Sequence, residues 1–318
     1  MKNLTFKIIT DVQEAKNIWD LFSPLQTIDD EWDFRYTFNK YLNFPLHFIV
    51  GFENDSPVGL LPLQLNTNKG ISQKKFGVKE PFLEFFGGID TDNNKIFLLP
   101  GYEYLLPQFL KQIQSTAILA PLADQYTLGQ QTAIHYTDKF VLGLESIRDF
   151  EMFLQTKFDG KSRQRLKNRI NHFNKNYKIE IKQGTETDLE LLFELSKDRF
   201  GEDSSFNMKH RRNILRDLRQ LYEIDLFVIY INGVPKAVSF GMLYNKTYDG
   251  INIGYDYDIR DLGKLVFVTQ IQRALELGCN VYDVGKNANG WKEHFHLNKI
   301  PQYKLAINFP HAYAAIGM

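Results

Sequence analysis

Residues 255–265 read Tyr255-Asp256-Tyr257-Asp258-Ile259-Arg260-Asp261-Leu262-Gly263-Lys264-Leu265. The residues before this stretch place Ile251 and Ile253 two positions apart, as in a strand. The residues after it repeat apolar side chains at helical spacing: Phe267, Val268, Ile271, Ala274 and Leu275. The sequence therefore predicts a strand, a turn that contains Gly263 and Lys264, and then the N-terminus of a helix.

The predicted turn has the chemistry of an anion site. Backbone N–H groups at a helix N-terminus lack helical partners, and the helix dipole favours a negative charge there. Arg260 and Lys264 add positive charge at the same place, and Tyr255 is a further candidate for contact with a ligand. Turns of this kind also occur for purely structural reasons, so the pattern alone leaves both interpretations open.

The composition is that of a globular protein without a strong charge bias. The chain has 318 residues, 43% of them hydrophobic, and its 38 Lys and Arg residues balance 38 Asp and Glu residues. Any preference for anions must therefore be local. The single cysteine, Cys279, excludes an internal disulfide and is expected to be a buried thiol. No apolar run is long enough to span a bilayer, and we expect a cytoplasmic protein.

A faint internal repeat indicates two domains. Residues 48–60 and 227–238 both have the pattern of a strand, a tight turn and a strand. The turn asparagines lie 232 − 54 = 178 residues apart, and the turn prolines lie 235 − 57 = 178 residues apart. Any two hairpins resemble each other, but the matching Asn-x-x-Pro favours duplication. We therefore expect two domains of similar size, at 1–147 and 148–318.

The remaining periodicities predict helices and strands in both halves. Helices of the first half are expected at 11–22, 30–41 and 102–113. Helices of the second half are expected at 146–156 (with Ser146 as its cap), 162–176, 187–200, 209–221 and from Gly263 to Leu277. Strands of the second half are expected at 226–231, 236–244, 247–254 and 281–284. A meander followed by a strand-helix-strand crossover predicts an α/β fold with a mixed, α+β type of sheet.

The two halves differ in chemistry. The comparable helix of the first half follows Pro100-Gly101 and carries Glu103, with no Arg or Lys, at its start. Pro107 is expected to disturb that helix further. We therefore expect the second half to hold a cofactor, and the first to serve as a scaffold or to bind an acceptor.

A second polar cluster follows the last predicted strand of the crossover. Asp283 stands at the end of that strand, and a loop rich in Gly and Asn leads from it to Lys292. Ligands bind beyond the ends of strands in open α/β sheets. A carboxylate and an ammonium near one cleft suit proton abstraction and oxyanion stabilisation. The alternative is a surface loop with solvated charges.

The third feature is a run of positive charge. Residues 157–178 contain eight basic residues and a single acid: Lys157, Lys161, Arg163, Arg165, Lys167, Arg169, Lys175 and Lys178 against Asp159. Arg163 and Arg169 flank the apolar stripe of the predicted helix and are candidates for contact with a substrate or phosphate. The alternative is a solvated helix face. No arrangement of His, Cys and acidic residues has the spacing of a metal site, and no nucleophile elbow, Walker loop or Rossmann glycine triplet is present.

Together these motifs resemble a known family. Arg260-Asp261-Leu262-Gly263-Lys264-Leu265 is similar to the R/Q-x-x-G-x-G/A pyrophosphate loop of GNAT acyltransferases, with Leu265 at the last small position. The chain resembles the tandem-GNAT proteins of the BioF2-like and CelD-like group, which are related to the FemAB aminoacyltransferases. The basic helix from Lys161 to Arg169, the element Asp283-Val284-Gly285 and the pair Trp291-Lys292 carry this resemblance, which covers about 148–305.

The resemblance implies two tandem GNAT-like domains and roles for individual residues. Gly263, with Arg260, Lys264 and Leu265, would cradle the pyrophosphate of acetyl-CoA or another acyl-CoA. Lys292 would stabilise the charged tetrahedral intermediate, and Asp283 would act as a base or would orient the reactants. An amine on a small molecule or on a cell-envelope precursor would attack the acyl group directly, and no metal is implied.

Two alternatives remain open. In FemAB proteins the donor is an aminoacyl-tRNA, and the basic helix would then contact RNA phosphates. The chain lacks a heptad stretch like the coiled-coil arm common in FemAB relatives, which favours acyl-CoA. A protein of a different class, a catalytically inactive tandem fold that binds acyl-CoA or a polyanion, is the other alternative. For the oligomeric state we favour a monomer.

Overall fold

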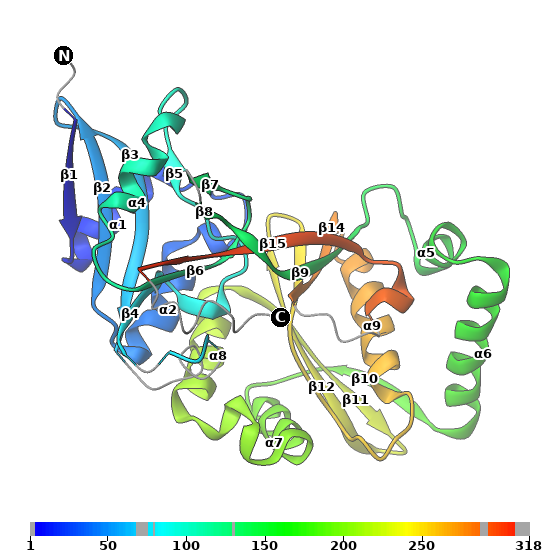
Figure 1. The fold of residues 1–318 in the computed structure, drawn as a ribbon. Helices are drawn as coiled ribbons and strands as arrows, with labels where there is room; N and C mark the ends of the chain where they lie inside the picture. Colours follow the sequence, from blue (N-terminus) through cyan, green and yellow to red (C-terminus); the bar gives the residue numbers. More distant parts are fainter. Residues whose placement is uncertain (1–3, 68–75, 79, 129–130, 287–291, 309–318) are drawn as a thin grey trace. The chain divides into compact units, whose positions relative to one another are not determined.

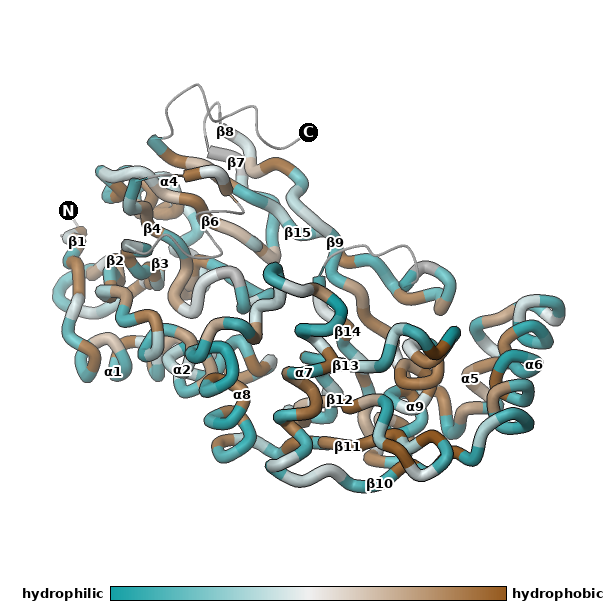
Figure 2. The backbone as a smooth tube through the Cα atoms, turned by 90° about the horizontal axis from the view of Figure 1, so that it is seen from below, coloured by the Kyte–Doolittle hydropathy of each residue, from teal (hydrophilic) through white to brown (hydrophobic). Residues whose placement is uncertain are grey.

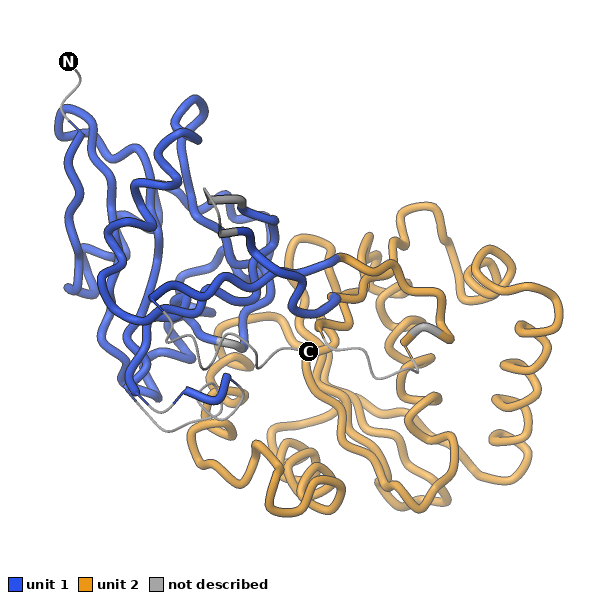
Figure 3. Tube along the Cα trace, in the orientation of Figure 1, with its two compact units in different colours: residues 1–138, 301–318 blue, residues 139–300 orange. Residues whose placement is uncertain are grey.

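The computed structural model describes residues 4–67, 76–78, 80–128, 131–286 and 292–308. The chain forms two compact units, residues 1–138 with 301–318, and residues 139–300 (Figure 3). The compact units divide at 138/139, and the last segment belongs to the first unit; the domain boundary expected at 147/148 stays a prediction. The strands β9 (Ile134–Gly143) and β15 (Asn298–Ile307) each contribute residues to both units.

The first unit contains a mixed sheet with the strand order β1-β2-β3-β4-β6-β15, and β5 pairs with β3. Neighbouring strands are antiparallel except β4 and β6, which are parallel. The strands before β9 are β1 (Leu4–Ile9), β2 (Leu46–Glu53), β3 (Ser56–Asn66), β4 (Phe82–Phe85), β5 (Phe97–Leu98), β6 (Ala117–Leu122) and the small pair β7 (Thr127–Leu128) and β8 (Gln131–Thr132). The helices are α1 (Val12–Phe22), α2 (Trp32–Leu42) and α4 (Leu106–Lys111), with 3-10 turns at Ile28–Asp30, Gly88–Asp90 and Glu103–Leu105.

In the second unit, the strands follow the order β9-β14-β13-β12-β11-β10 (Figure 1). Only the β13–β14 neighbours are parallel. Its further strands are β10 (Ile179–Gln183), β11 (Glu223–Ile231), β12 (Val234–Tyr244), β13 (Thr247–Tyr255) and β14 (Val281–Lys286). Its helices are α5 (Phe150–Lys157), α6 (Gly160–Asn176), α7 (Asp188–Phe200), α8 (Lys209–Leu221) and α9 (Leu262–Glu276), with 3-10 turns at Gly201–Asp203, Ser205–Asn207 and Lys292–Phe295. The predicted α/β fold with mixed sheets is confirmed.

Two helix predictions need correction. The helix expected from Ser146 begins at Phe150, because the Asp149 carboxylate caps it by accepting from the Met152 N–H at 2.8 Å. The helix expected at 102–113 is the shorter α4. Pro107 does not disturb it, because it stands in the first turn, where a missing N–H costs no helical hydrogen bond.

The internal repeat extends to backbone detail. Both central residues of each hairpin turn have positive φ, at Asn54 and Asp55 and again at Asn232 and Gly233. Such turns match the twist of the flanking strands. Each hairpin also has a register shift, between residues 51 and 52 and between residues 229 and 230, again 229 − 51 = 178 apart. Two independent irregularities at one offset support two copies of one ancestral unit.

The core of the second unit lies on both faces of its sheet. Phe227, Ile229 and Ile231 alternate along β11 and pack with Phe173 of α6 and with α9: Leu262, Leu265 and Val266. Figure 2 shows α9 as a mostly hydrophobic segment and α6 as a mostly hydrophilic one. The helix α7 packs against β12 and β13. Cys279 lies in this core, and burial raises the pKa of its thiol to about 11, so the thiol is a poor nucleophile.

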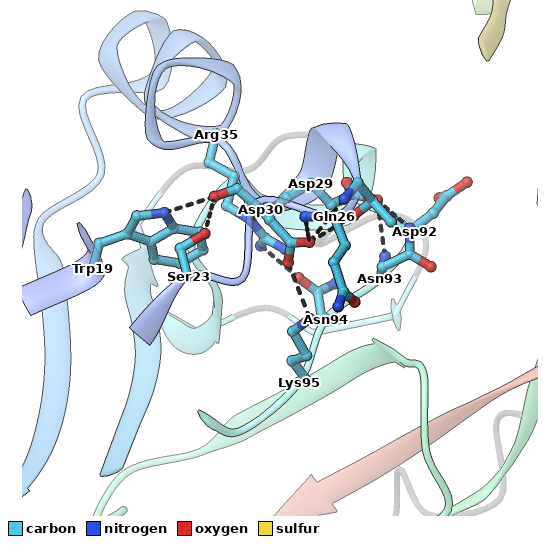
Figure 4. A network of polar contacts seen from close by, with 11 residues as sticks. Trp19, Ser23, Gln26, Asp29, Asp30, Arg35, Asp92, Asn93, Asn94 and Lys95 are labelled. Carbon is cyan, nitrogen blue, oxygen red and sulfur yellow. Dashed lines mark hydrogen bonds and ion pairs between the residues drawn. The ribbon is translucent and has the colours of Figure 1, made fainter. Parts of the chain in front are cut away.

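A buried polar network fixes the long loop between β4 and α4 in the first unit (Figure 4). The Arg35 guanidinium, on α2, donates to the Phe86 carbonyl at 2.7 Å and to Asn94 Oδ1 at 2.6 Å. The Asp29 carboxylate accepts the N–H groups of Asp92 and Asn93, both at 3.1 Å. This loop occupies the place in the repeat that the turn before α9 has in the second unit.

The start of the α4 segment is also closed to an anion. Glu103 accepts the Gly101 N–H at 3.2 Å, so a carboxylate of the chain already occupies that amide.

Candidate functional site

The site begins where two parallel strands separate. The ladder between β13 and β14 pairs 247–249 with 281–283 and then ends, although β13 continues to Tyr255 and β14 to Lys286. Past the last pair, the described residues of the two strands form no further ladder with each other. Extended ligands with amide groups bind such edges through main-chain hydrogen bonds.

The helix α9 begins at the open end of this separation, with its N-terminus at the site. Asp261 is its cap and has φ of 65°, a left-handed conformation that Asp and Asn tolerate better than most residues. The amides of Leu262, Lys264 and Leu265 donate to carbonyls of residues 259 and 261. Within the described residues, the Gly263 N–H has no such acceptor, so it is available to an anion.

Residue 263 must be a glycine, because the Tyr255 side chain leaves no room for a Cβ there. A Cβ at residue 263 would lie 2.6 Å from the Tyr255 ring and 2.7 Å from its hydroxyl oxygen, which is closer than such atoms approach. The Tyr255 ring in turn stacks on Tyr257, with centroids 4.4 Å apart. The aromatic side chain therefore packs directly over the glycine at the mouth of the helix.

The positive charges at this mouth surround an internal carboxylate. Lys264 donates to Asp261, and nitrogen atoms of Arg260 and Arg169 lie 3.8 and 3.9 Å from the same carboxylate. The hydrogen bond from Lys264, with these charges, holds the pKa of Asp261 below its ordinary value. Asp261 is thus ionised, and it offsets part of the positive charge that an incoming phosphate would meet.

A cavity of about 460 Å³ unites most of the predicted residues. The open part of β13 forms one wall, with Ile251 and Ile253, and Val284 of β14 lies on another. The mouth of α9 and Lys292 complete it. Of the predicted site residues, the cavity is lined by Tyr255, Arg260, Gly263, Lys264 and Lys292.

Lys292 is buried, with 4% of its surface exposed. Its ammonium donates to the carbonyls of Val284, Gly285 and Lys286 at 3.0, 3.1 and 3.0 Å and lies 5.1 Å from the Phe140 ring centroid. The ammonium therefore fixes the end of β14 and places a positive charge in the cavity wall. Its predicted neighbour Trp291 lies outside the described residues.

Asp283 is not among the residues that line this cavity. Its carboxylate pairs with the Lys139 ammonium of β9 at 2.5 Å, and both side chains are more than nine-tenths buried. It also accepts the Gly285 N–H at 2.8 Å. These contacts tie together β9 and the end of β14.

The other predicted site residues, Leu265, Arg169 and Arg163, do not line this cavity. Leu265 is in the core, and its N–H belongs to the first turn of α9. Arg169 lines a second cavity beside the mouth of α9. Arg163 lines neither described cavity.

Sequence reasoning missed Arg199 at the end of α7. Its guanidinium lies 4.5 Å from the Tyr257 ring centroid and lines the main cavity. A basic residue at the end of a helix has many ordinary uses, so nothing in the local sequence distinguishes it.

The described residues show neither a metal-binding group nor a helix suited to a membrane span. Within the described parts of the chain, no group of three or more His, Cys, Asp or Glu side chains could hold a metal ion. Among the same residues, no helix combines the length and apolarity that a membrane span needs.

In the second unit, the parallel strands β13 and β14 of a mixed sheet separate beside the N-terminus of α9. Residues 160–293 match the profile of the acetyltransferase (GNAT) domain. This match supports acyltransferase activity, and a solved tandem GNAT structure supports a fold with two GNAT-like domains.

Solved structures support the fold over nearly the whole chain. FemX is similar with a TM-score of 0.58 and 10% identity, covering 98% of this chain and 100% of that one. A tandem GNAT protein from the clavulanic acid biosynthesis pathway has a TM-score of 0.55 and 10% identity, covering 96% and 98%. L-PGS from Bacillus licheniformis has a TM-score of 0.52 and 12% identity, covering 89% and 93%. Comparison with curated protein sequences gives no match.

Proposed function

We propose that the protein transfers an acyl group from an acyl-CoA to an amine, and that the second unit binds the donor. The observation that carries this proposal is the cavity lined by the separated ends of β13 and β14 and by the N-terminus of α9. An acyl-pantetheine chain has amides for the strand edges, and its pyrophosphate suits the Gly263 amide with Lys264 and Arg260. The first unit, whose comparable loop is closed by Arg35 and Asp29, serves as a scaffold or binds the acceptor.

The chemistry is a direct transfer. The amine nitrogen forms a bond to the acyl carbon, the carbon–sulfur bond breaks, and the proton lost by the amine neutralises the departing thiolate. Holding both reactants in one cavity supplies much of the rate enhancement. No covalent intermediate on the enzyme is needed.

Lys292 is our candidate for stabilising the negative charge of the tetrahedral intermediate. Its positive charge in the buried wall acts in a region of low dielectric. All three of its hydrogens are engaged by carbonyls, so the charge acts through space or exchanges one of those bonds. We propose that Asp283, paired with Lys139, orients the end of β14; a role as base requires an opening of this buried pair.

Aminoacyl-tRNA is the second candidate donor. The fold similarity to FemX and the exposed basic residues of α6 favour it. For the acceptor, the similarity to FemX and L-PGS leads us to propose an amine on a cell-envelope precursor or on a lipid, beside small-molecule amines. Arg199 and Tyr257, at the wall of the cavity, are placed to contact it.

The direct test is product formation. The protein would be incubated with acetyl-CoA and a panel of small-molecule and lipid amines, with free thiol and acetylated product measured together. We expect thiol release that depends on the amine and on Lys264. Product obtained only with aminoacyl-tRNA would replace the proposed donor.

A further inference from the structure

The helices α7 and α9 lie on opposite faces of β13 in the second unit. Side chains alternate between the two faces along a strand. A Cβ at Gly254 would lie 3.0 Å from the Leu192 carbonyl oxygen of α7. The next residue, Tyr255, packs over Gly263 of α9. The cavity proposed for the donor is lined by Gly263 from α9 and by Arg199 from α7, so it has a wall on each face of the sheet.

Arg199, in the last turn of α7, is held against three aromatic rings. Its guanidinium lies 4.5 Å from the ring centroid of Tyr257, 5.7 Å from that of Tyr255 and 4.4 Å from that of Phe200. Tyr255 and Tyr257 are themselves stacked. These cation–π contacts restrict the position of an otherwise exposed side chain, and the N–H groups at the edge of the guanidinium can still donate to a ligand.

Arg199 differs from the other cations of the cavity because no acceptor of the chain engages it. Lys264 donates to Asp261, and Arg260 lies 3.8 Å from the same carboxylate. Lys292 donates to three backbone carbonyls. The Arg199 guanidinium has no hydrogen-bond or ion-pair partner among the residues that the structure describes. Its planar set of N–H donors matches a carboxylate or a phosphate, which it can bind through two hydrogen bonds.

The charge of the cavity limits the kind of amine that can enter it. The charged residues that line it are four cations and one acid: Arg199, Arg260, Lys264 and Lys292 against Asp261. The pyrophosphate of the proposed donor offsets the charges at the N-terminus of α9, but not the guanidinium on the α7 side. A simple alkyl amine is a cation at neutral pH and would be repelled there, whereas an amine that also carries an anionic group would be attracted.

We infer that Arg199 binds an anionic group of the acceptor, which is therefore an amine that also bears a carboxylate or a phosphate. The inference rests on the proposed function, because it describes the acceptor of the same transfer reaction. The anionic group meets the guanidinium at the end of α7, and the amine reaches the thioester in the gap between β13 and β14. The donor, bound from the α9 face, leaves this side of the cavity to the acceptor.

The test measures steady-state acetyl transfer by the full chain at saturating acetyl-CoA, with two matched pairs of amines. The carboxylate pair is 4-aminobutyrate and 4-aminobutanamide, and the phosphate pair is phosphoethanolamine and ethanolamine. In at least one pair, kcat/KM should be about tenfold higher for the anionic member, since charge-assisted hydrogen bonds are strong. The pair that shows the preference identifies the anionic group.

Variants of α7 connect this preference to one side chain. Arg199→Gln should remove it by raising KM for the anionic amine, with KM for acetyl-CoA unchanged. Arg199→Lys, which keeps the charge without the planar set of donors, should recover only part of it. The matched control is Lys197→Gln, which removes a positive charge from the same last turn of α7 outside the cavity lining and should keep the preference.

Three results would overturn the inference. Equal kcat/KM within both pairs would exclude recognition of an anionic group and leave the proposed donor intact. A raised KM for acetyl-CoA in Arg199→Gln, with the preference kept, would make Arg199 a ligand of the donor phosphates. Product from aminoacyl-tRNA only, with no thiol released from acetyl-CoA by any of the four amines, would overturn the proposed function together with this inference.

Discussion

At the scale of single residues, Asp261 adds a negative charge to the proposed pyrophosphate site. Its carboxylate lies at the N-terminus of α9 and engages Lys264, with Arg169 and Arg260 close by. A phosphate bound there would face one negative charge at a few ångströms. The Asp261 carboxylate also holds the flexible Lys264 side chain beside the N-terminus of α9. It therefore weakens phosphate binding by repulsion, while it fixes the position of the lysine.

Asp261→Asn should therefore strengthen acetyl-CoA binding by about fivefold, or about 1 kcal/mol for a partly exposed charge pair. Asparagine has a similar shape and tolerates the left-handed backbone at this residue. Calorimetry at low salt measures the change. Lys264→Ala is the opposite control and should weaken binding about tenfold. Weaker binding by the asparagine variant would mean that the carboxylate mainly positions the cations.

Gly263 shows why a substitution must be chosen with its neighbours in view. Any side chain at this residue meets Tyr255 first. A Gly263→Asp variant would then displace the aromatic stack as well as repel a phosphate. The charge variants at residues 261 and 264 avoid that ambiguity.

Lys292→Met separates the structural and catalytic roles of the buried ammonium. The methionine keeps most of the apolar stem but leaves three carbonyls without their donor, which should cost about 2–4 kcal/mol of stability. Thermal unfolding measures this loss. If the charge also stabilises the intermediate, kcat of the folded variant should fall on the order of 100-fold with little change in donor affinity. A loss of stability with kcat unchanged would confine Lys292 to fixing the end of β14.

At the scale of elements, the pair Lys139–Asp283 joins β9 to β14 in the second unit. Removal of one partner of a buried ion pair leaves an uncompensated charge. The pair thus offers a stability measurement that also bears on the proposed role of Asp283.

Lys139→Met and Asp283→Asn should each destabilise the protein by about 3–5 kcal/mol, and the double variant should recover a large part of that loss. Chemical denaturation of the four proteins gives the coupling. Activity then decides the role of the carboxylate. A double variant that is stable and active would exclude Asp283 as an essential base, whereas a stable and inactive one would support that role.

The elements predicted from the sequence are those with strong local signals. The helix 209–221 and the hairpins follow from their apolar periods and turn residues, and the structure confirms them. Asp149 and Ser146 are both residue types that commonly cap helices, so the local sequence does not decide between them. The placement of β15 residues in the first unit depends on pairing with β6, at a separation that local pattern does not reach.

The site shows the same limit. Gly263, Lys264 and Arg260 are adjacent in sequence, and Tyr255 precedes them closely, so a local motif could predict their association. Lys139 lies 283 − 139 = 144 residues from Asp283, and Arg199 reaches the cavity from another helix. Such contacts are set by the sheet order and by helix packing, which residue spacing does not contain.

At the scale of the whole molecule, the two units carry one fold with different interiors. The second unit has an open strand separation and an available amide at α9. In the first unit, hydrogen bonds donated by Arg35 and accepted by Asp29 hold the comparable loop. Duplication followed by closure of one copy would account for a tandem protein in which, as we propose, the second unit binds the donor.

The most direct test of this account is a titration of the full chain with acetyl-CoA and, separately, with aminoacyl-tRNA at several salt concentrations. We expect acetyl-CoA to bind with a dissociation constant on the order of 10 μM, within the common range for enzyme substrates, and tRNA to bind weakly. The account would be contradicted by no heat with acetyl-CoA together with micromolar tRNA binding. In that case, the logarithm of the tRNA association constant would fall with the logarithm of the salt concentration, with a slope of about −0.7 to −0.9 per phosphate contact. The tRNA binding would also be lost in an Arg163/Arg165/Arg169 triple variant.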